Sequence, residues 1–462
     1  EISTRDWSSD VCSSDLNTAP ASSLAPSVGT SPQTALGITF SSGTTNAYTI
    51  SGGTGGTLTI GTSGITNSSG TLQTFSVPLT VSGNQTWNVA STGNLSFSGT
   101  VALGTSTLTL SGSSSGTGTI SGVISDTTPT GGRIIKSGSG GWTLSGNNTF
   151  TGGVTIGAAG GADAGTLTNA NAGGLGNANN VTIYGGTLAT STFTETIGTL
   201  TLGGGASGST ASLTGSTGTI TLGGNVTFNA TNNPNGATIS APLDLGATRT
   251  FTVGDSNAAA ADLTVSGAIS GTGFGLTKTG AGTLLLSGTN TYTGGTTVSA
   301  GTLNLANTST LTSSSGGLTL SGGTLLLSNT GTYSLGAVTV SSSSTIDFGT
   351  AGVTNLSLSN LTIASGATLT INNWVRNSDT FTVTSAPNIN TTTVSAGATI
   401  DRTSVNFSNY GELAQWNGTN FSNQLAAVPE PSTYGAMMMA GCAGLLGWRR
   451  WRRKDKAAAP SA

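Results

Sequence analysis

The sequence alternates apolar residues with Thr or Ser at a period of two along almost its whole length. Segments 57–60, 107–110, 199–202 and 368–371 are examples. Period-two alternation predicts strands with one buried face, and Thr and Val favour strands over helices. Clusters of Gly, Ser and Asn interrupt the pattern as turns do, roughly every ten residues. No segment before residue 434 shows helical periodicity, so the sequence predicts an all-β body.

The arrangement of these strands is constrained by their shortness. A short strand cannot bury its apolar face alone and needs neighbours stacked on both sides. The body 37–371 is too long for one sandwich, is evenly spaced and shows no domain break, so we predict a right-handed parallel β-helix. At roughly 20 residues per coil and ~4.8 Å between strands, residues 17–427 would form about 20 coils. We expect hydrogen-bonded Thr and Ser ladders between the coils.

Composition excludes several classes of function. There is no His, so Ser-His-Asp and Cys-His catalysis and most catalytic zinc sites are excluded. Lys and Arg number 13 against 16 Asp and Glu, which leaves no basic face for nucleic acid. Cys12 and Cys442 lie near the two ends, so the body has no disulfide. The sequence predicts no catalytic residue, no cofactor, no metal and no nucleic-acid partner.

The first residues differ from the body. Segment 1–16 has no Gly and carries Trp7, Cys12 and four acidic residues. It lacks the basic start and apolar run of a signal peptide, and it resembles translated sequencing-adapter read-through. We predict that 1–16 is non-native, the alternative being a short soluble tail. We expect the native start and any export signal to be missing, and 17–36 to be a disordered lead-in.

One longer unit occurs twice, at about 121–156 and 266–303. The matching residues are Gly138, Gly140, Gly146, Asn148, Phe150, Gly152 and Gly153 in the first copy, and Gly280, Gly282, Gly288, Asn290, Tyr292, Gly294 and Gly295 in the second. We predict that they are structural, forming strands and turns. The matching Lys136 and Lys278 are predicted to be surface charges at a turn. Trp142 stands where Leu284 does, and we expect it to be packed.

The second copy resembles a known repeat. Residues 276–303 read LTKTGAGTLLLSGTNTYTGGTTVSAGTL and resemble the autotransporter-associated β-strand repeat, also called the passenger-associated transport repeat. The first copy is a divergent version. The resemblance implies a β-helical passenger or surface protein exported by a bacterium. Autotransporters end in a membrane β-barrel, whereas this chain ends in a different pattern.

The C-terminal pattern has three parts within 429–454, namely Pro-Glu-Pro, an apolar stretch at 434–448 and a basic cluster. The residues are Pro429, Glu430, Pro431, Arg449, Arg450, Arg452, Arg453 and Lys454. The stretch is shorter than the roughly 20 residues of a full span, but its flanking Arg and Trp suit a membrane interface. The sequence predicts a short transmembrane helix with a cytoplasmic C-terminus, followed by a tail at 455–462.

This pattern resembles the PEP C-terminal sorting signal, which exosortase recognises. The resemblance implies an inner-membrane-anchored precursor in a Gram-negative bacterium that exports polysaccharide. It also implies cleavage near Pro-Glu-Pro and delivery to the cell surface, outer membrane or extracellular matrix. The alternative is a plain C-terminal anchor.

Residues 372–412 are richer in aromatic side chains, including Trp374, Phe381 and Phe407. Because the end of a β-helix exposes unpaired strand edges, we predict a C-terminal cap here and a linker at 413–428. The alternative is an aromatic platform that binds carbohydrate.

The predicted function is a non-enzymatic, exported structural protein of the cell surface or matrix, with extracellular polysaccharide as a partner. One alternative is an adhesin whose loops bind glycans or cells. Another is a polysaccharide lyase or hydrolase, which needs clustered carboxylates. The nearest such pair is Asp255 and Asp262, which we predict to be a solvated loop pair. The single Gly160-Gly161-Ala162-Asp163 does not make a calcium β-roll.

Overall fold

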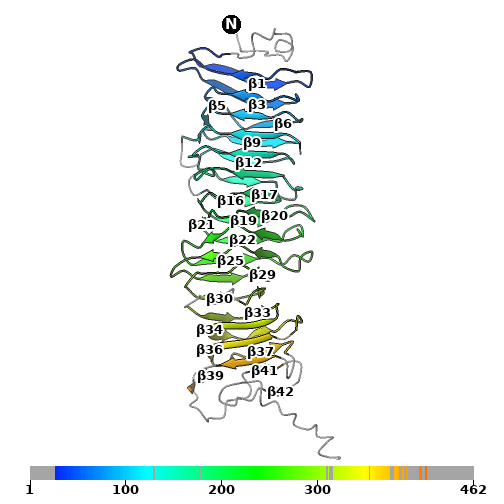
Figure 1. The fold of residues 1–462 in the computed structure, drawn as a ribbon, viewed down its shortest axis with the longest axis vertical. Helices are drawn as coiled ribbons and strands as arrows, with labels where there is room; N and C mark the ends of the chain where they lie inside the picture. The colour runs from blue at the N-terminus through cyan, green and yellow to red at the C-terminus, as the bar shows by residue number, and fades with distance from the viewer. Residues whose placement is uncertain are drawn as a thin grey trace, which may run out of the picture.

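A computed structural model shows a parallel β-solenoid of about 15 turns, drawn as an upright rod in Figure 1. It describes residues 27–383, apart from 114, 128–130, 177–178, 309–310, 312–315, 353 and 375–378, together with short strands at 388–389, 392–393, 405–407 and 412–413. Up to the C-terminal end of the rod, each described strand is a rung that pairs in parallel with the equivalent strand of a neighbouring coil. The predicted β-helix is therefore confirmed.

Three faces surround the core. Face 1 comprises β1 (Gln33–Phe40), β3 (Leu58–Asn67), β6 (Gln85–Val89), β9 (Thr107–Gly112), β12 (Arg133–Lys136), β14 (Val154–Ile156), β16 (Val181–Ile183), β19 (Leu200–Gly203), β22 (Val226–Asn229), β25 (Arg249–Val253), β28 (Leu276–Thr279), β30 (Thr296–Val298), β32 (Leu318–Ser321), β34 (Gly331–Ser342) and β36 (Thr354–Ile363). Face 2 comprises β2 (Thr49–Ile50), β4 (Gln73–Phe75), β7 (Leu95–Phe97), β10 (Thr117–Ile120), β13 (Gly141–Leu144), β15 (Thr166–Asn169), β17 (Gly186–Ala189), β20 (Ala211–Thr214), β23 (Ala237–Ile239), β26 (Leu263–Val265), β29 (Thr283–Leu286), β31 (Thr302–Leu305), β33 (Thr324–Leu327), β35 (Ser344–Asp347), β37 (Leu369–Asn372) and β41 (Val405–Phe407).

Face 3 is narrower and is built from short strands. They are β5 (Leu79–Val81), β8 (Val101–Ala102), β11 (Ile124–Ser125), β18 (Glu195–Ile197), β21 (Ile220–Leu222), β24 (Leu243–Asp244), β27 (Ile269–Ser270) and β38 (Thr380–Val383). The long strands β34 and β36 run through faces 3 and 1 without a break, since β38 pairs with the first half of β36. At the C-terminal end, β39 (Asn388–Ile389) pairs antiparallel with β40 (Thr392–Thr393), and β41 pairs antiparallel with β42 (Glu412–Leu413).

The core is one continuous column of inward side chains from Val28 to Val383. Within each strand, buried apolar residues alternate with outward Thr or Ser, as in β16 and β32. Each fully buried Leu, Ile or Val contributes about 1.5–3 kcal/mol relative to exposure. In the N-terminal third the column is aromatic, with ring centroids 5.0 Å apart for Phe75 and Phe97 and 4.1 Å apart for Trp87 and Phe97.

Two expectations about the coils need correction. Val154 pairs with Val181, which in turn pairs with Leu200, so coil length varies around a mean above the expected 20 residues, and the turns number about 15. The expected hydroxyl ladders are also sparse. Among the described residues, hydroxyl–hydroxyl bonds between coils join Thr238 to Ser212 and Thr252 to Thr279. Backbone hydrogen bonds carry the stacking instead.

The first strand begins at Gln33, inside the segment that the sequence assigns to a disordered lead-in. No helix in the described part of the chain is long and apolar enough to cross a membrane. The predicted non-native segment 1–16 and the predicted helix 434–448 lie outside the described residues.

Candidate functional site

The two repeat units fold alike and provide the chemically distinctive positions of the rod. In the first copy the chain runs through β11, β12, β13 and β14, and in the second through β27, β28, β29 and β30. In each copy a face 1 strand ends in a Gly-rich corner, a face 2 strand follows, and an Asn-containing corner leads into the next coil. The corners are therefore where the matching residues gather.

Lys136 is buried inside the first of these corners. Its side chain has no exposed surface, and its Nζ donates to the carbonyl oxygens of Ser137, Gly138 and Ala164 at 2.7, 2.7 and 2.8 Å. The three acceptors match the three N–H donors of an ammonium group. The expectation that Lys136 is a surface charge is wrong, because its ammonium fastens the corner to the following coil.

Lys278 occupies the same position in the second copy and is equally buried. Its Nζ donates to the carbonyl oxygens of Thr279, Gly280 and Ala300 at 2.9, 2.8 and 3.1 Å, so the surface prediction is wrong here too. Burial lowers the pKa of both lysines to about 8, and the negative charge of Asp262 opposes this shift in the pKa of Lys278. Period-two alternation carried the missed signal, because Lys278 lies two residues after Leu276 on the same face.

Two matching glycines shape the backbone that surrounds the buried lysines. Gly138 and Gly280 follow the lysines with φ of +65° and +76°, a conformation that L side chains rarely adopt. This backbone turn places the carbonyl groups around the ammonium. A Cβ at matched positions 140 and 282, 146 and 288, or 152 and 294 would also lie closer than 3.0 Å to the backbone of the preceding coil. These contacts support the predicted structural role of the glycines.

Asn148 and Asn290 complete the second corner. Oδ1 of Asn148 accepts the backbone N–H of Ile124 at 2.7 Å, and its Nδ2 donates to the Gly174 carbonyl. Oδ1 of Asn290 accepts the N–H of Ile269 at 2.9 Å. Each buried Asn therefore satisfies a strand end on face 3 of the preceding coil, where a bare N–H would be costly.

The aromatic positions are packed. Phe150 and Tyr292 are both buried, and the Tyr292 hydroxyl lies 2.6 Å from Oγ1 of Thr296. Burial raises the pKa of Tyr292 to about 12. Trp142 is also buried, as predicted, and its Nε1 donates to the Ser111 carbonyl at 2.9 Å.

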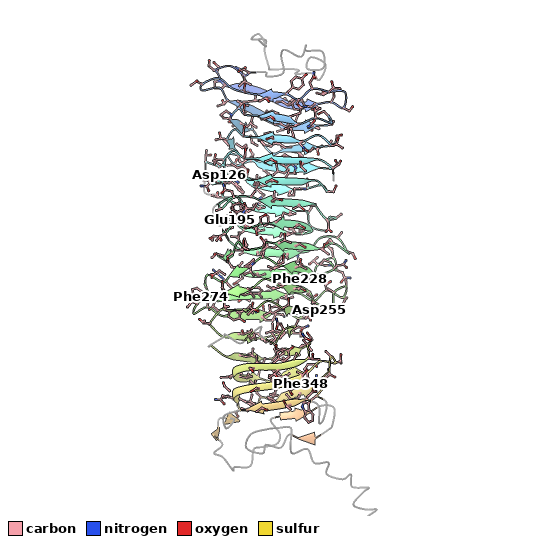
Figure 2. All side chains as sticks on the ribbon, in the orientation of Figure 1. Asp126, Glu195, Phe228, Asp255, Phe274 and Phe348 are labelled. Atoms are coloured by element: carbon pink, nitrogen blue, oxygen red, sulfur yellow. The ribbon has the colours of Figure 1, made fainter. Side chains whose placement is uncertain are left out.

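The acidic residues of the described part are dispersed, and several are held by backbone N–H groups. Asp262 is buried, accepting from Ser256 N at 2.6 Å and from Thr283 N at 2.7 Å. The prediction of a solvated pair is therefore wrong for Asp262, although Asp255 is exposed. Asp126, Glu195 and Asp255 lie at different heights along the rod in Figure 2. No group of three potential metal ligands occurs among the described residues.

Sequence reasoning missed the role of Glu195. This buried carboxylate accepts the N–H groups of Gly173 and Leu175 at 2.6 and 2.8 Å, and it fastens the turn of the preceding coil. Burial raises the pKa of Glu195, against the opposing effect of these hydrogen bonds. Glu195 and Ile197 share the buried face of one strand, so alternation would have located it.

These features define a repeat β-solenoid protein whose buried polar groups hold one coil to the next. Two family models match the chain. The passenger-associated transport repeat matches residues 134–161 and 276–305, and the PEP-CTERM protein-sorting motif matches residues 427–454. No curated protein and no solved structure matches it. The chain thus carries both predicted motifs.

The two motifs together fit an exported surface protein. The sorting motif implies export, a membrane-anchored precursor in a Gram-negative bacterium and processing by exosortase. Pro429, Glu430, Pro431 and the basic cluster at 449–454 lie outside the described residues, so their individual roles stay predictions.

Proposed function

We propose that the mature protein is a structural rod of the bacterial cell surface or extracellular matrix, with no enzymatic activity of its own. The observation that carries the proposal is the continuous core of the solenoid, in which parallel pairing and buried polar corners link successive coils. A rod that is paired along its length resists bending and exposes few strand edges. Its work is mechanical: a stalk, coat or spacer.

The low charge of the rod fits a polysaccharide-rich matrix. Charged residues make up 6% of the whole chain. Seven of the ten acidic residues in 17–427 accept hydrogen bonds from backbone N–H groups: Asp126, Asp163, Glu195, Asp244, Asp262, Asp347 and Asp379. Carboxylates engaged in this way serve the fold. We propose further that 372–412 caps the rod, since antiparallel pairs at its C-terminal end terminate the parallel stacking.

Sorting is tested by expressing the full chain in a host with exosortase and in the same host without it. We expect a surface product that lacks 434–462 in the first host and a membrane-bound precursor in the second. Glu430→Ala should leave the precursor uncleaved, whereas Glu412→Ala, outside the motif, should leave cleavage unchanged. Mass spectrometry of the product gives the result, and an intact tail in the exosortase host contradicts the proposal.

The structural role is tested in the producing bacterium. Deletion of the chain should soften or thin the extracellular matrix, and re-expression should restore it. Measurable turnover of matrix polysaccharide by the purified full chain would overturn the non-enzymatic assignment.

A further inference from the structure

Midway along the rod, the corner at which the chain passes from face 1 to face 2 carries long loops. The coil between the first two loops and the coil after the last have corners of two and three residues, 184–185 and 280–282. In four other coils the corner has seven or nine residues, and we call these segments the corner loops: 157–165, 204–210, 230–236 and 254–262. In repeat proteins such insertions gather on one side, which is often the side that binds.

The corner loops are tied to one another. Hydrogen bonds of 2.7–3.1 Å join each corner loop to the next one along the rod, through the pairs Gly160 and Gly204, Gly161 and Ala206, Gly208 and Asn235, and Asn233 and Ser256. The first two of these pairs reach across the short corner 184–185. A surface that is held in place before binding loses less conformational entropy when a ligand binds.

Polar groups converge beneath the first two loops, and one of them has no partner. A Cβ at Gly205 would lie 2.4 Å from Ser209 Oγ and 2.5 Å from the Tyr184 carbonyl oxygen. A Cβ at Gly185 would lie 2.5 Å from Oδ1 of Asp163. Ser209 is 5% exposed, and its Oγ has no hydrogen-bond partner in the described protein. A buried hydroxyl without a partner is unusual, and a polar ligand here would satisfy it.

The last two loops offer unpaired polar groups to solvent. Asp255, labelled in Figure 2, and Asn257 are exposed, and neither side chain makes a hydrogen bond or an ion pair among the described residues. Asn233 and Asn235 are also exposed, and their bonds to neighbouring loops leave Nδ2 of Asn233 and Oδ1 of Asn235 free. A carboxylate accepts and an amide both donates and accepts, so these groups match ligand hydroxyls, which do both.

The composition of the corner loops argues against other occupants. They contain no Lys or Arg, which an anionic ligand would need. Calcium takes six to eight oxygen ligands, and no group of three potential metal ligands occurs in the described part of the chain. Protein partners are usually anchored on large side chains, whereas the loops contain only Gly, Ala, Ser, Thr, Asn, Asp and Pro. A neutral ligand rich in hydroxyl groups remains.

We propose that the corner loops bind a neutral polysaccharide. The half-buried Tyr184, in the short corner between two of the loops, adds an aromatic ring against which a sugar can pack. Coils lie about 4.8 Å apart, so the loops extend over about 20 Å, long enough for several sugar units to bind at once. The inference rests on the proposed function, because it names the surface by which the rod attaches to a matrix.

The test is retention of the purified full chain in native gels that contain dextran or galactomannan, with polygalacturonate as the anionic probe. The neutral polymers should retain the wild type and polygalacturonate should not. Asp255→Ala and Asn257→Ala should each raise the dissociation constant roughly fivefold or more, the effect of losing about one hydrogen bond. Ser209→Ala should weaken retention without lowering the unfolding temperature, because its Oγ has no partner in the described protein.

Asn147→Ala is the matched control. Asn147 is exposed at another corner, and its side chain makes no hydrogen bond among the described residues, so this variant should bind as wild type does. Circular dichroism verifies that all variants fold. Adding or chelating calcium should leave retention unchanged.

Four results would overturn the proposal: no retention by either neutral polymer, equal retention by polygalacturonate, an equal loss in Asn147→Ala, or retention that requires calcium. Failure of the proposed structural role gives a different result, namely a matrix that is unchanged when the chain is deleted. A rod whose deletion softens the matrix but which binds neither neutral polymer would refute the binding surface alone.

Discussion

The two copies of the transport repeat are alike in their corners and different in their core. Both bury a lysine under three carbonyl oxygens and use an Asn to satisfy the preceding coil. On face 2, however, Trp142 stacks against Gly118, whereas Leu284 stacks against Leu263. In the first copy a large side chain pairs with a glycine, which has none. In the second copy two side chains of intermediate size pair with each other. The copies thus share backbone chemistry, while volume is adjusted between neighbouring coils.

Removing a corner lysine should have the largest effect. Lys136→Met leaves three buried carbonyls without their donor, and each unsatisfied group costs about 1–3 kcal/mol. We expect the opening free energy of β12–β14 to fall by about 3 kcal/mol or more in native-state hydrogen exchange. Lys278→Met should cause a fall of the same size in the second copy if the two corners are equivalent.

Arg133→Met is the control for this prediction, since Arg133 lies on the same strand but is exposed. It should change the opening free energy by less than about 0.5 kcal/mol. If Arg133→Met and Lys136→Met lowered the opening free energy equally, the buried ammonium would have no special role.

Gly118→Ala tests how core volume is shared between Gly118 and Trp142. The added Cβ would lie closer than 3.0 Å to the ring of Trp142, and such overpacking costs about 1–3 kcal/mol. Adding Trp142→Leu should recover part of that loss, so a double-mutant cycle should give a favourable coupling. Urea unfolding monitored at this coil measures it, and strictly additive effects would contradict the compensation.

The lysines also predict how stability depends on pH. Burial lowers the pKa of Lys136 to about 8 from the ordinary lysine value of 10.5, so between these values the folded state binds fewer protons than the unfolded state. The contribution of Lys136 to the free energy of unfolding therefore rises with pH across that window. The stability gap between wild type and Lys136→Met should widen from pH 8 to 10.5, whereas a constant gap would show that the pKa is not lowered.

The smallest expected effect concerns the aromatic position. Tyr292→Phe makes the second copy resemble the first, which has Phe150, but leaves the buried Thr296 hydroxyl without this partner. We expect a loss of about 1 kcal/mol, measured by hydrogen exchange of β30. The double variant Tyr292→Phe with Thr296→Val should lose less, and a larger loss would argue against the hydrogen bond as the cause.

Much of the fold follows from local sequence pattern. Alternation at segments such as 199–202 and 368–371 predicted the strands, and the evenness of their spacing predicted parallel stacking. The length of each coil could not be predicted well from the sequence. The corner loops differ in length, and only the strand pairing shows which residues stack on one another. The matched residues of the two copies were found from sequence, but their roles as carbonyl, amide and ring contacts were not.

The sequence by itself determined the repeat, the all-β character and the sorting motif, because each is encoded in residues close together along the chain. Tertiary structure alone decided what Lys136, Lys278 and Glu195 do. Their partners lie on turns or in the adjoining coil, and Ala164, Leu175 and Ala300 are twenty or more residues away along the chain. Stacking also turned isolated Thr into columns, since a residue that faces outward on one coil acquires neighbours only when the next coil is laid in register beside it.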